Sequence, residues 1–337
     1  MASLSGRPTA PIRKTSAYNP AFEQLMIDHS IYPLRYRVPN NLNATTPQPN
    51  NLAEERKLLS KRRPSLDSFT ETDFEDFQQK NDAANTEATV YQTVVPLITG
   101  SSDSPSWANN LFSNLEDIAE DVVKPKPDFF DGAHRMAIHE KIRSANEGGN
   151  LNLNKLIIPT NNVRTPVLPN FFMELKGPES NARIAQRQVM HVGAVGARAM
   201  NSVQNWGKEE PSYDGNAYTF SSTYHDGLLG LYAHHVAPPT APGGRPQYYM
   251  TLVKSFCLTN DIDTWRQGVK AFRNARDRAR WHRDNFIQAA NARAGQSDGA
   301  AAAPPEAGTG TTAAAGVADV VVDGEPAHIS TAASSRA

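Results

Sequence analysis

A glutamate and a lysine lie two positions apart in the clearest strand that the sequence predicts, residues 170–176. Side chains alternate between the two faces of a strand, so Glu174 and Lys176 project together while Met173 and Leu175 cover the core on the other face. Phosphodiester hydrolysis requires carboxylates that hold a divalent metal ion and a cation near the attacking water. The strand therefore predicts one half of a metal-dependent phosphodiesterase site.

A second carboxylate is supplied by Asp128, which follows Pro127 at the start of a short predicted strand, residues 128–132. Two carboxylates that are brought close together repel each other unless a cation lies between them or one of them takes up a proton. We therefore expect Asp128 and Glu174 to share a site, with Asp131 as the alternative second acid.

The Glu-x-Lys spacing is short, and the chain has a second copy in Glu55-Arg56-Lys57, inside a segment predicted to lack regular structure. The tripeptide alone therefore does not define a site. A structural Glu–Lys pair on a solvent-facing sheet is the alternative interpretation of residues 174–176.

The elements that must position these residues follow from apolar spacing and from turn residues. The Pro-rich and Gly-rich segment 143–168 is predicted to be an inserted loop or hairpin, and Asp226-Gly227 a hairpin turn. The predicted helices cover residues 70–77, 86–98, 180–206 and 260–292. The predicted strands cover residues 111–115, 128–132, 170–176, 217–223, 228–235 and 248–258.

The two ends of the chain differ in composition from its middle. Residues 1–67 are rich in Pro, Asn, Ser and Thr, which predicts a mostly disordered region with a short docking element near 18–37. Residues 68–292 are predicted to form one α/β domain, and residues 293–337 a disordered Ala/Gly/Thr tail.

The composition excludes several classes of protein. The single cysteine, Cys257, excludes an intramolecular disulfide and any multi-cysteine metal site. No stretch reaches the roughly 18 apolar residues of a membrane span, and the N-terminus lacks a signal-peptide core, so we expect an intracellular protein of the nucleus or cytoplasm, away from membranes. The net charge of −1 means that any phosphate-binding surface must be local.

The residues around the two acids also resemble a known family. The segments KPDFFDGA and ELKGPESNARIAQRQ are similar to the PD-(D/E)xK nuclease superfamily, and more closely to an uncharacterised fungal domain family assigned to it. The resemblance covers about residues 18–292. It implies a restriction-endonuclease-like α/β fold, in which a mixed central sheet is flanked by helices.

The resemblance also implies roles for individual residues. Asp128 and Glu174 match the ligands of Mg²⁺ or Mn²⁺, and Lys176 matches the residue that positions the attacking water. Glu87 matches an accessory acid and metal ligand by its place before the sheet, and Gln188 matches a helix residue that contacts phosphate. The chain departs from the pattern in the 46 positions between Asp128 and Glu174 (174 minus 128), which requires the segment 143–168 to be an insertion.

The last predicted helix carries several arginines that could bind backbone phosphates. A solvated helix face that covers the core with its apolar stripe is the alternative interpretation. The candidates for phosphate contacts are Arg273, Arg276 and Arg280.

These observations favour a Mg²⁺-dependent nuclease that acts on nucleic acid, DNA more than RNA. The first alternative is a catalytically inactive module of the same fold that binds nucleic acid or a protein partner. The second is an interaction protein that contacts a protein partner through its terminal segments.

Overall fold

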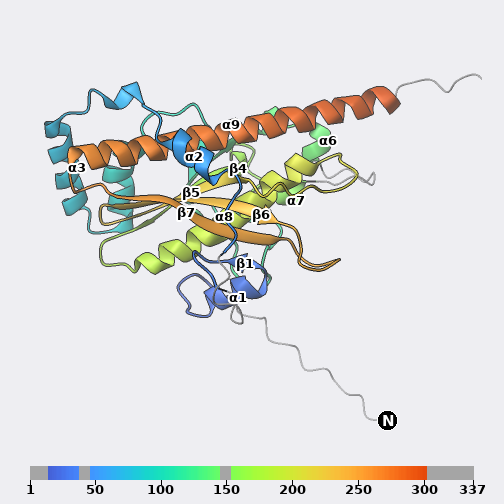
Figure 1. The fold of residues 1–337 in the computed structure, drawn as a ribbon, viewed down its shortest axis with the longest axis horizontal. Helices are drawn as coiled ribbons and strands as arrows, with labels where there is room; N and C mark the ends of the chain where they lie inside the picture. Colours follow the sequence, from blue (N-terminus) through green and yellow to red (C-terminus); the bar gives the residue numbers. More distant parts are fainter. Residues whose placement is uncertain (1–13, 38–45, 145–152, 302–337) are drawn as a thin grey trace, which may run out of the picture.

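The computed structural model describes residues 14–37, 46–144 and 153–301, without the side chains of residues 297–301. This part of the chain forms an α/β fold around one seven-stranded mixed sheet with the strand order β1-β7-β6-β5-β4-β3-β2, flanked by helices (Figure 1). The strands are β1 (Ile31–Tyr32), β2 (Ser106–Ala108), β3 (Phe129–Ala133), β4 (Val167–Lys176), β5 (Ala217–His225), β6 (Leu228–Ala237) and β7 (Gln247–Cys257).

The centre of the sheet is formed by strands that the sequence predicts. β3 pairs antiparallel with β4, and β4 pairs parallel with β5 across a connection that contains the helix α8 (Ala182–Asn205). β5 and β6 form a hairpin through Asp226 and Gly227, which have φ of 47° and 77°. Positive φ at both central residues is typical of the two-residue hairpin turn whose backbone matches the twist of the flanking strands. The Asp-Gly sequence favours this turn.

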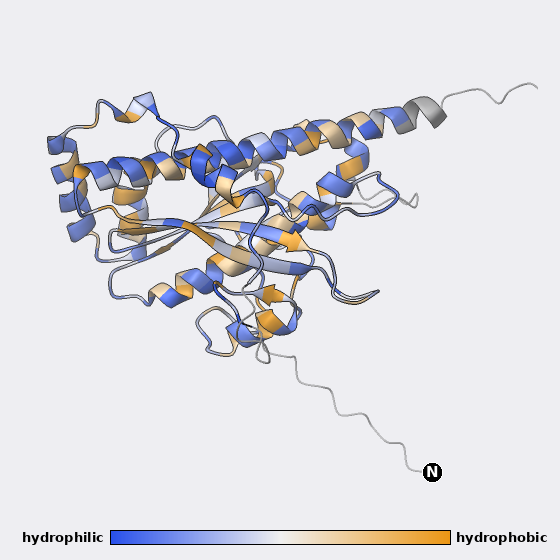
Figure 2. Cartoon of the chain, in the orientation of Figure 1, coloured by the Kyte–Doolittle hydropathy of each residue, from blue (hydrophilic) through white to orange (hydrophobic). Residues whose placement is uncertain are grey.

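Two long helices cover opposite faces of the sheet (Figure 1). α9 (Ile262–Ala301) packs on the face that carries Phe171, whose ring meets that of Phe272 edge to face at 5.2 Å. α8 packs on the other face, where Val192 joins a cluster with Phe172. Apolar residues are interspersed with hydrophilic ones along α9 (Figure 2), as expected for a helix with only one covered face.

A broken helical segment precedes the sheet. It follows α3 (Glu71–Ala83) and consists of α4 (Glu87–Thr89), a π-helical turn η2 (Val90–Val94) and α5 (Val95–Thr99). In the π turn the Val95 N–H donates to the carbonyl of Val90, five residues back. Pro96 has no N–H to donate, so it interrupts the regular helical ladder next to this turn. The predicted helix over 86–98 is present, with a widened turn at its centre.

The prediction of a strand over residues 111–115 is wrong, because these residues have no regular secondary structure. Phe112 is fully buried and Leu111 is 47% exposed, which produces an alternation like that of a strand. The backbone N–H groups of this segment donate instead to loop carbonyls, as Phe112 does to Pro125. The edge of the sheet is formed by β2, a short strand that the sequence reasoning missed.

The expected docking element is present in α1 (Phe22–Asp28) and β1. Phe22 and Met26 pack against Val189 and Met190 of α8, and β1 extends the sheet beside β7. The docking is therefore intramolecular.

Residues 46–67 differ from the expected disorder, since they contain α2 (Leu52–Leu59) and the 3-10 turn η1 (Pro64–Leu66). The Glu55 carboxylate is fully buried and accepts two hydrogen bonds from Arg278, at 2.7 and 3.0 Å, and one contact from His282 at 3.0 Å. Arg278 lies 223 residues away in the chain, so no local pattern could show this anchor. The expectation for residues 1–13 and 38–45 lies outside the described residues.

The predicted insertion at 143–168 follows the short elements η3 (Arg135–Ala137) and α6 (Glu140–Arg143). It contains the short helix α7 (Asn154–Ile157), and its last two residues begin β4. α9 continues to Ala301, beyond the expected end near residue 292, and the rest of the predicted tail, residues 302–337, lies outside the described part of the chain. No helix within the described ranges has the length and apolar character that a membrane crossing requires.

Candidate active site

Strand register brings the two predicted carboxylates together. Asp128 immediately precedes β3, and Phe129 pairs with Met173 of β4, so Asp128 lies opposite Glu174. Side chains that are directly opposite in an antiparallel pair lie on the same face, about 5 Å apart at Cβ. The Asp128 Oδ2 atom also accepts a hydrogen bond from the Leu175 N–H at 2.8 Å, which fixes this carboxylate against β4.

The two carboxyl groups are buried next to each other, and each affects the ionisation of the pair. Burial raises the pKa of Glu174 well above its usual range, and the charge of Asp128 raises it further. Burial also raises the pKa of Asp128, although the hydrogen bond from Leu175 opposes this. The pair therefore behaves as two like charges that avoid ionising together.

Lys176 lies beside the acids and is 1% exposed. Its Nζ donates to Glu87 Oε2 at 2.8 Å and to the Leu175 carbonyl at 2.5 Å. Burial lowers the pKa of Lys176, but the hydrogen bond to Glu87 and the charges of Asp128 and Glu87 outweigh burial and leave it raised. The ammonium is therefore held in its charged form next to the carboxyl pair.

A pocket of about 250 Å³ reaches this cluster from the surface. Glu174 and Lys176 do not line it and lie behind Asp128 and Leu175. Among the residues that the structure describes, no lysine or arginine lines this pocket. The lining residues are Glu87, Ala88, Tyr91, Gln92, Asn109, Asp128 and Leu175.

A divalent cation fits the donor set of this cluster. Glu174 Oε2 is buried without a hydrogen-bond partner, and a buried polar atom left unpaired costs about 1–3 kcal/mol. A cation held by Asp128 and Glu174 would satisfy that oxygen and offset the repulsion between the two carboxylates. Within the described residues no group of three or more His, Cys, Asp or Glu side chains has ligand geometry, so these two carboxylates would be the protein's main ligands.

Gln188 and Glu87 lie near this cluster in different roles. Gln188 lies one helical turn before Val192 on the same face of α8. Val192 packs in one cluster with Phe172 of β4, so Gln188 is directed toward the end of β4 that contains Glu174. Its Oε1 atom is also buried without a partner. Glu87 lines the pocket, but its carboxylate is the salt-bridge partner of Lys176.

The three arginines predicted to hold phosphates are not brought to this pocket. Arg276 is 3% exposed and pairs with Asp131 at 2.7 and 2.9 Å, and Arg273 donates to the carbonyls of Leu97 and Ile98. Arg280 is partly exposed near Asp284. The partners of Arg273 and Arg276 are internal, which gives these residues a structural role.

Asp131, the alternative second acid, is fully buried in its ion pair with Arg276, which is also hydrogen-bonded to Ser106. A buried carboxylate that is already paired with a guanidinium has no need of a metal ion. The structure therefore places Asp128, and not Asp131, beside Glu174.

Sequence reasoning missed three side chains that line the pocket together with Asp128, namely Tyr91, Gln92 and Asn109. Tyr91 and Gln92 lie in the π turn, and helical periodicity does not show a widened turn. Asn109 has a positive φ of 51°, a conformation that Asn tolerates more readily than most residues. Its place in the polar pair Asn109-Asn110 was the only signal in the sequence.

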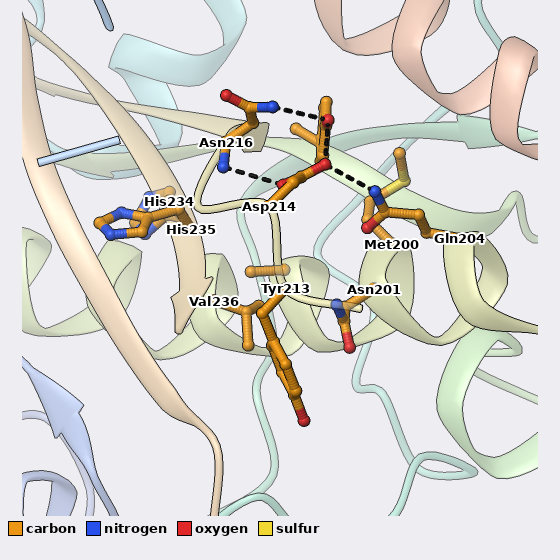
Figure 3. A pocket seen from close by; sticks show the side chains of 11 residues that line it. Met200, Asn201, Gln204, Tyr213, Asp214, Asn216, His234, His235 and Val236 are labelled. Atoms are coloured by element: carbon orange, nitrogen blue, oxygen red, sulfur yellow. Dashed lines mark hydrogen bonds between the residues drawn. The ribbon is translucent and has the colours of Figure 1, made fainter. Parts of the chain in front are cut away.

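A second hollow lies where α8 passes the strands β5 and β6 (Figure 3). It has only about 10 Å³ of free space, enough for about one water molecule. Asp214 fills its polar side by accepting hydrogen bonds from Gln204 at 2.8 Å and Tyr218 at 2.6 Å. His234 and His235 line it, and burial lowers the pKa of each, to about 3 and about 4. We interpret this cluster as structural.

Comparison with known proteins identifies one family. The family described as "Domain of unknown function (DUF7924)" matches residues 73–290, which is 218 of the 337 residues (290 minus 73 plus 1). No curated protein and no solved structure matches the chain.

Proposed function

The chain belongs to the DUF7924 family of unknown function, and we propose from the geometry of its buried polar cluster that it is a divalent-metal-dependent nuclease acting on DNA. The observation that carries the proposal is the meeting of Asp128 and Glu174 on adjacent strands, with an unpartnered Glu174 oxygen and Lys176 two residues along. Such a set, at the end of a pocket, has the residue types that phosphodiester hydrolysis requires.

Each residue has a defined role in this proposal. Asp128 and Glu174 would hold Mg²⁺ or Mn²⁺ through their carboxylate oxygens. Lys176 orients the attacking water and stabilises the negative charge that develops on the phosphate. Glu87 keeps Lys176 charged and in place through their 2.8 Å salt bridge. Gln188 supplies a neutral oxygen or amide N–H at the Glu174 end of β4.

The bound ion would supply charge neutralisation for the phosphate and an acidified water. The charges in the pocket support this role. The acidic residues Asp128 and Glu87 line the pocket, and no lysine or arginine among the described residues does so. A phosphodiester would be repelled there unless a cation came with it. The resemblance to the PD-(D/E)xK superfamily supports the same chemistry and a restriction-endonuclease-like arrangement of the sheet.

The proposal predicts cleavage of single-stranded or double-stranded DNA by the purified full chain with Mg²⁺ or Mn²⁺. Glu174→Gln and Lys176→Met should each lower the cleavage rate about 10²- to 10³-fold, the usual loss when one group that stabilises the transition state is removed. Cleavage of labelled strands resolved on a gel measures both rates.

The second Glu-x-Lys copy provides a matched control. Lys57 occupies the same place in its tripeptide but is exposed on α2, so Lys57→Met should cleave at the wild-type rate. Wild-type cleavage by Glu174→Gln, or no cleavage by the wild-type chain on any nucleic acid, would count against the proposal.

One observation favours the inactive alternative, a nuclease-fold module that only binds. Glu174 and Lys176 are each 1% exposed and lie behind the pocket wall. A binding module would hold DNA with a strong dependence on salt concentration and would leave it uncut. Lys176→Met would then leave binding unchanged, which separates this alternative from the nuclease.

A further inference from the structure

The pocket next to Asp128 is lined by three side chains whose polar groups make no hydrogen bond within the described part of the chain, namely Tyr91, Gln92 and Asn109. Gln92 and Asn109 are exposed to solvent, whereas Tyr91 is half-buried and packs against the main core. The pocket thus offers one immobilised aromatic ring and two free amides.

Irregular backbone presents all three side chains. Tyr91 and Gln92 belong to the π turn η2, and Asn109 adopts a left-handed conformation with φ of 51° while its N–H donates to the Asp128 carbonyl at 3.2 Å. π turns inside α-helices are frequent at functional sites, and a left-handed non-glycine residue is retained where it serves a function. Two independent distortions therefore converge on one wall.

The chemistry of this wall matches a nucleobase. An aromatic ring stacks on any base, and Asn and Gln amides pair with the donor and acceptor groups along a base edge. The volume of about 250 Å³ lies just below the range of about 300–1,000 Å³ typical of drug-sized ligands. The pocket is therefore suited to one base and not to a base pair.

We propose that this pocket binds one unstacked nucleobase of the strand whose phosphate lies at Asp128, so that the substrate is a strand with an unpaired nucleotide. This inference rests on the proposed nuclease function and adds its substrate class. A base within an intact duplex is stacked and paired, and it would have to leave the helix to enter. Single-stranded DNA meets this requirement without that cost.

The test compares the binding of two strands with the same backbone by the full chain, with Ca²⁺ in place of Mg²⁺. One is a twelve-nucleotide thymidine strand, and the other is its abasic counterpart with a tetrahydrofuran at every position. Fluorescence anisotropy should show about tenfold tighter binding of the thymidine strand, the size of effect expected from one base stacked on an aromatic ring.

Tyr91→Leu should reduce this preference to within about twofold, because the ring is lost while the apolar contact with the core is kept. Tyr36→Leu is the matched control, since Tyr36 is half-buried beyond β1, at the opposite edge of the sheet, and the preference should remain. Gln92→Ala changes an exposed residue that does not affect folding, and it should weaken thymidine binding several-fold with abasic binding unchanged.

Equal binding of the two strands by the wild type, or an undiminished preference in Tyr91→Leu, would overturn the base pocket. The same samples with Mg²⁺ separate this outcome from failure of the proposed function. Cleavage of both strands without a preference keeps the nuclease and removes the pocket. If the chain neither binds nor cleaves either strand, both the base pocket and the proposed nuclease function are wrong.

Discussion

At the scale of single residues, burial decides which groups can ionise. His191 and His234 are nearly inaccessible to solvent, and burial lowers their pKa values to about 4 and about 3. His234 is held neutral beside Ser221, with its Nε2 2.7 Å from the hydroxyl oxygen. His235 has a pKa that burial lowers to about 4. These three histidines make the fold sensitive to acid.

This burial predicts that stability falls as the pH decreases. The unfolded chain takes up protons on these histidines below about pH 6.5, while the folded chain does not until near pH 4 or below. Each group then lowers the free energy of unfolding by about 1.4 kcal/mol per pH unit between pH 6.5 and its folded pKa. The stabilising contribution is thus complete above pH 6.5 and is lost as the pH falls.

The variant His191→Leu should remove one such contribution. Urea unfolding gives the free energy of unfolding at pH 8 and at pH 5. The loss between these two pH values should be smaller in the variant than in the wild type by about 2 kcal/mol, since pH 5 lies 1.5 units below 6.5 and each unit contributes about 1.4 kcal/mol. The raised pKa of Glu174 acts in the opposite direction, so the difference between variant and wild type is the quantity to compare. An equal pH dependence of the two proteins would contradict a neutral His191 in the folded state.

The residue types of the site could be predicted from the sequence, but their partners could not. Alternation in the strand predicts that Glu174 and Lys176 share a face, and the structure has Lys176 beside the Glu174–Asp128 pair. The sequence predicts that Asp128 and Glu174 share a site, but it does not give the register between their two strands, which are far apart in the chain. Arg276 shows the limit clearly, because helical spacing does not distinguish a solvated arginine from one buried against Asp131.

At the scale of elements, close packing of α8 on the sheet depends on its glycines. A Cβ atom added at Gly193 would lie 2.1 Å from the His234 ring, and one at Gly196 would lie 2.6 Å from Phe172. Only glycine therefore allows α8 to lie this close to the sheet at these two positions. Since α8 also carries Gln188, its distance from β4 determines the depth of the candidate site.

Gly193→Ala should therefore lower the free energy of unfolding by about 1–3 kcal/mol, because the new methyl group displaces a buried imidazole. Gly295→Ala is the matched control on α9, where no atom lies within 4 Å of the added Cβ. There the better helix propensity of Ala should stabilise the protein by up to about 1 kcal/mol. Urea denaturation gives both values, and equal stability of the two variants would contradict the packing described.

Two segments differ from their predictions because their backbone is irregular. In residues 111–115, buried side chains alternate as in a strand while the backbone bonds to loops. The π turn of residues 90–94 keeps an approximately helical apolar pattern, so the widened turn that presents Tyr91 was invisible in the sequence. Local patterns report burial, and they report backbone hydrogen bonding only where the element is regular.

At the scale of the whole molecule, one face of the sheet carries the main core and the other carries the candidate site. The face under α9 contains the largest apolar cluster and the buried ion pair of Arg276 with Asp131. The face under α8 carries Phe172 and, further along β4, Glu174 and Lys176. The long basic helix therefore supports the site from behind, contrary to the expectation that its arginines would hold phosphates there.

The segment before the matched family region belongs to the same fold. β1 completes the edge of the sheet beside β7, and α2 is anchored by Glu55 to Arg278 and His282 on α9. Removal of one partner from such a buried pair typically costs about 3–5 kcal/mol. The sequence composition of residues 46–67 could not reveal this role, because the anchoring partners are more than half the chain away.

The central claim is that Asp128 and Glu174 together hold one divalent cation, and Mn²⁺ binding followed by electron paramagnetic resonance tests it most directly. The wild-type chain should bind one Mn²⁺ ion at this site, and Asp128→Asn and Glu174→Gln should each lose it, while Glu179→Gln, a change in an exposed acid just after β4, should retain it. Retention of that ion with unchanged affinity in Glu174→Gln would contradict the account.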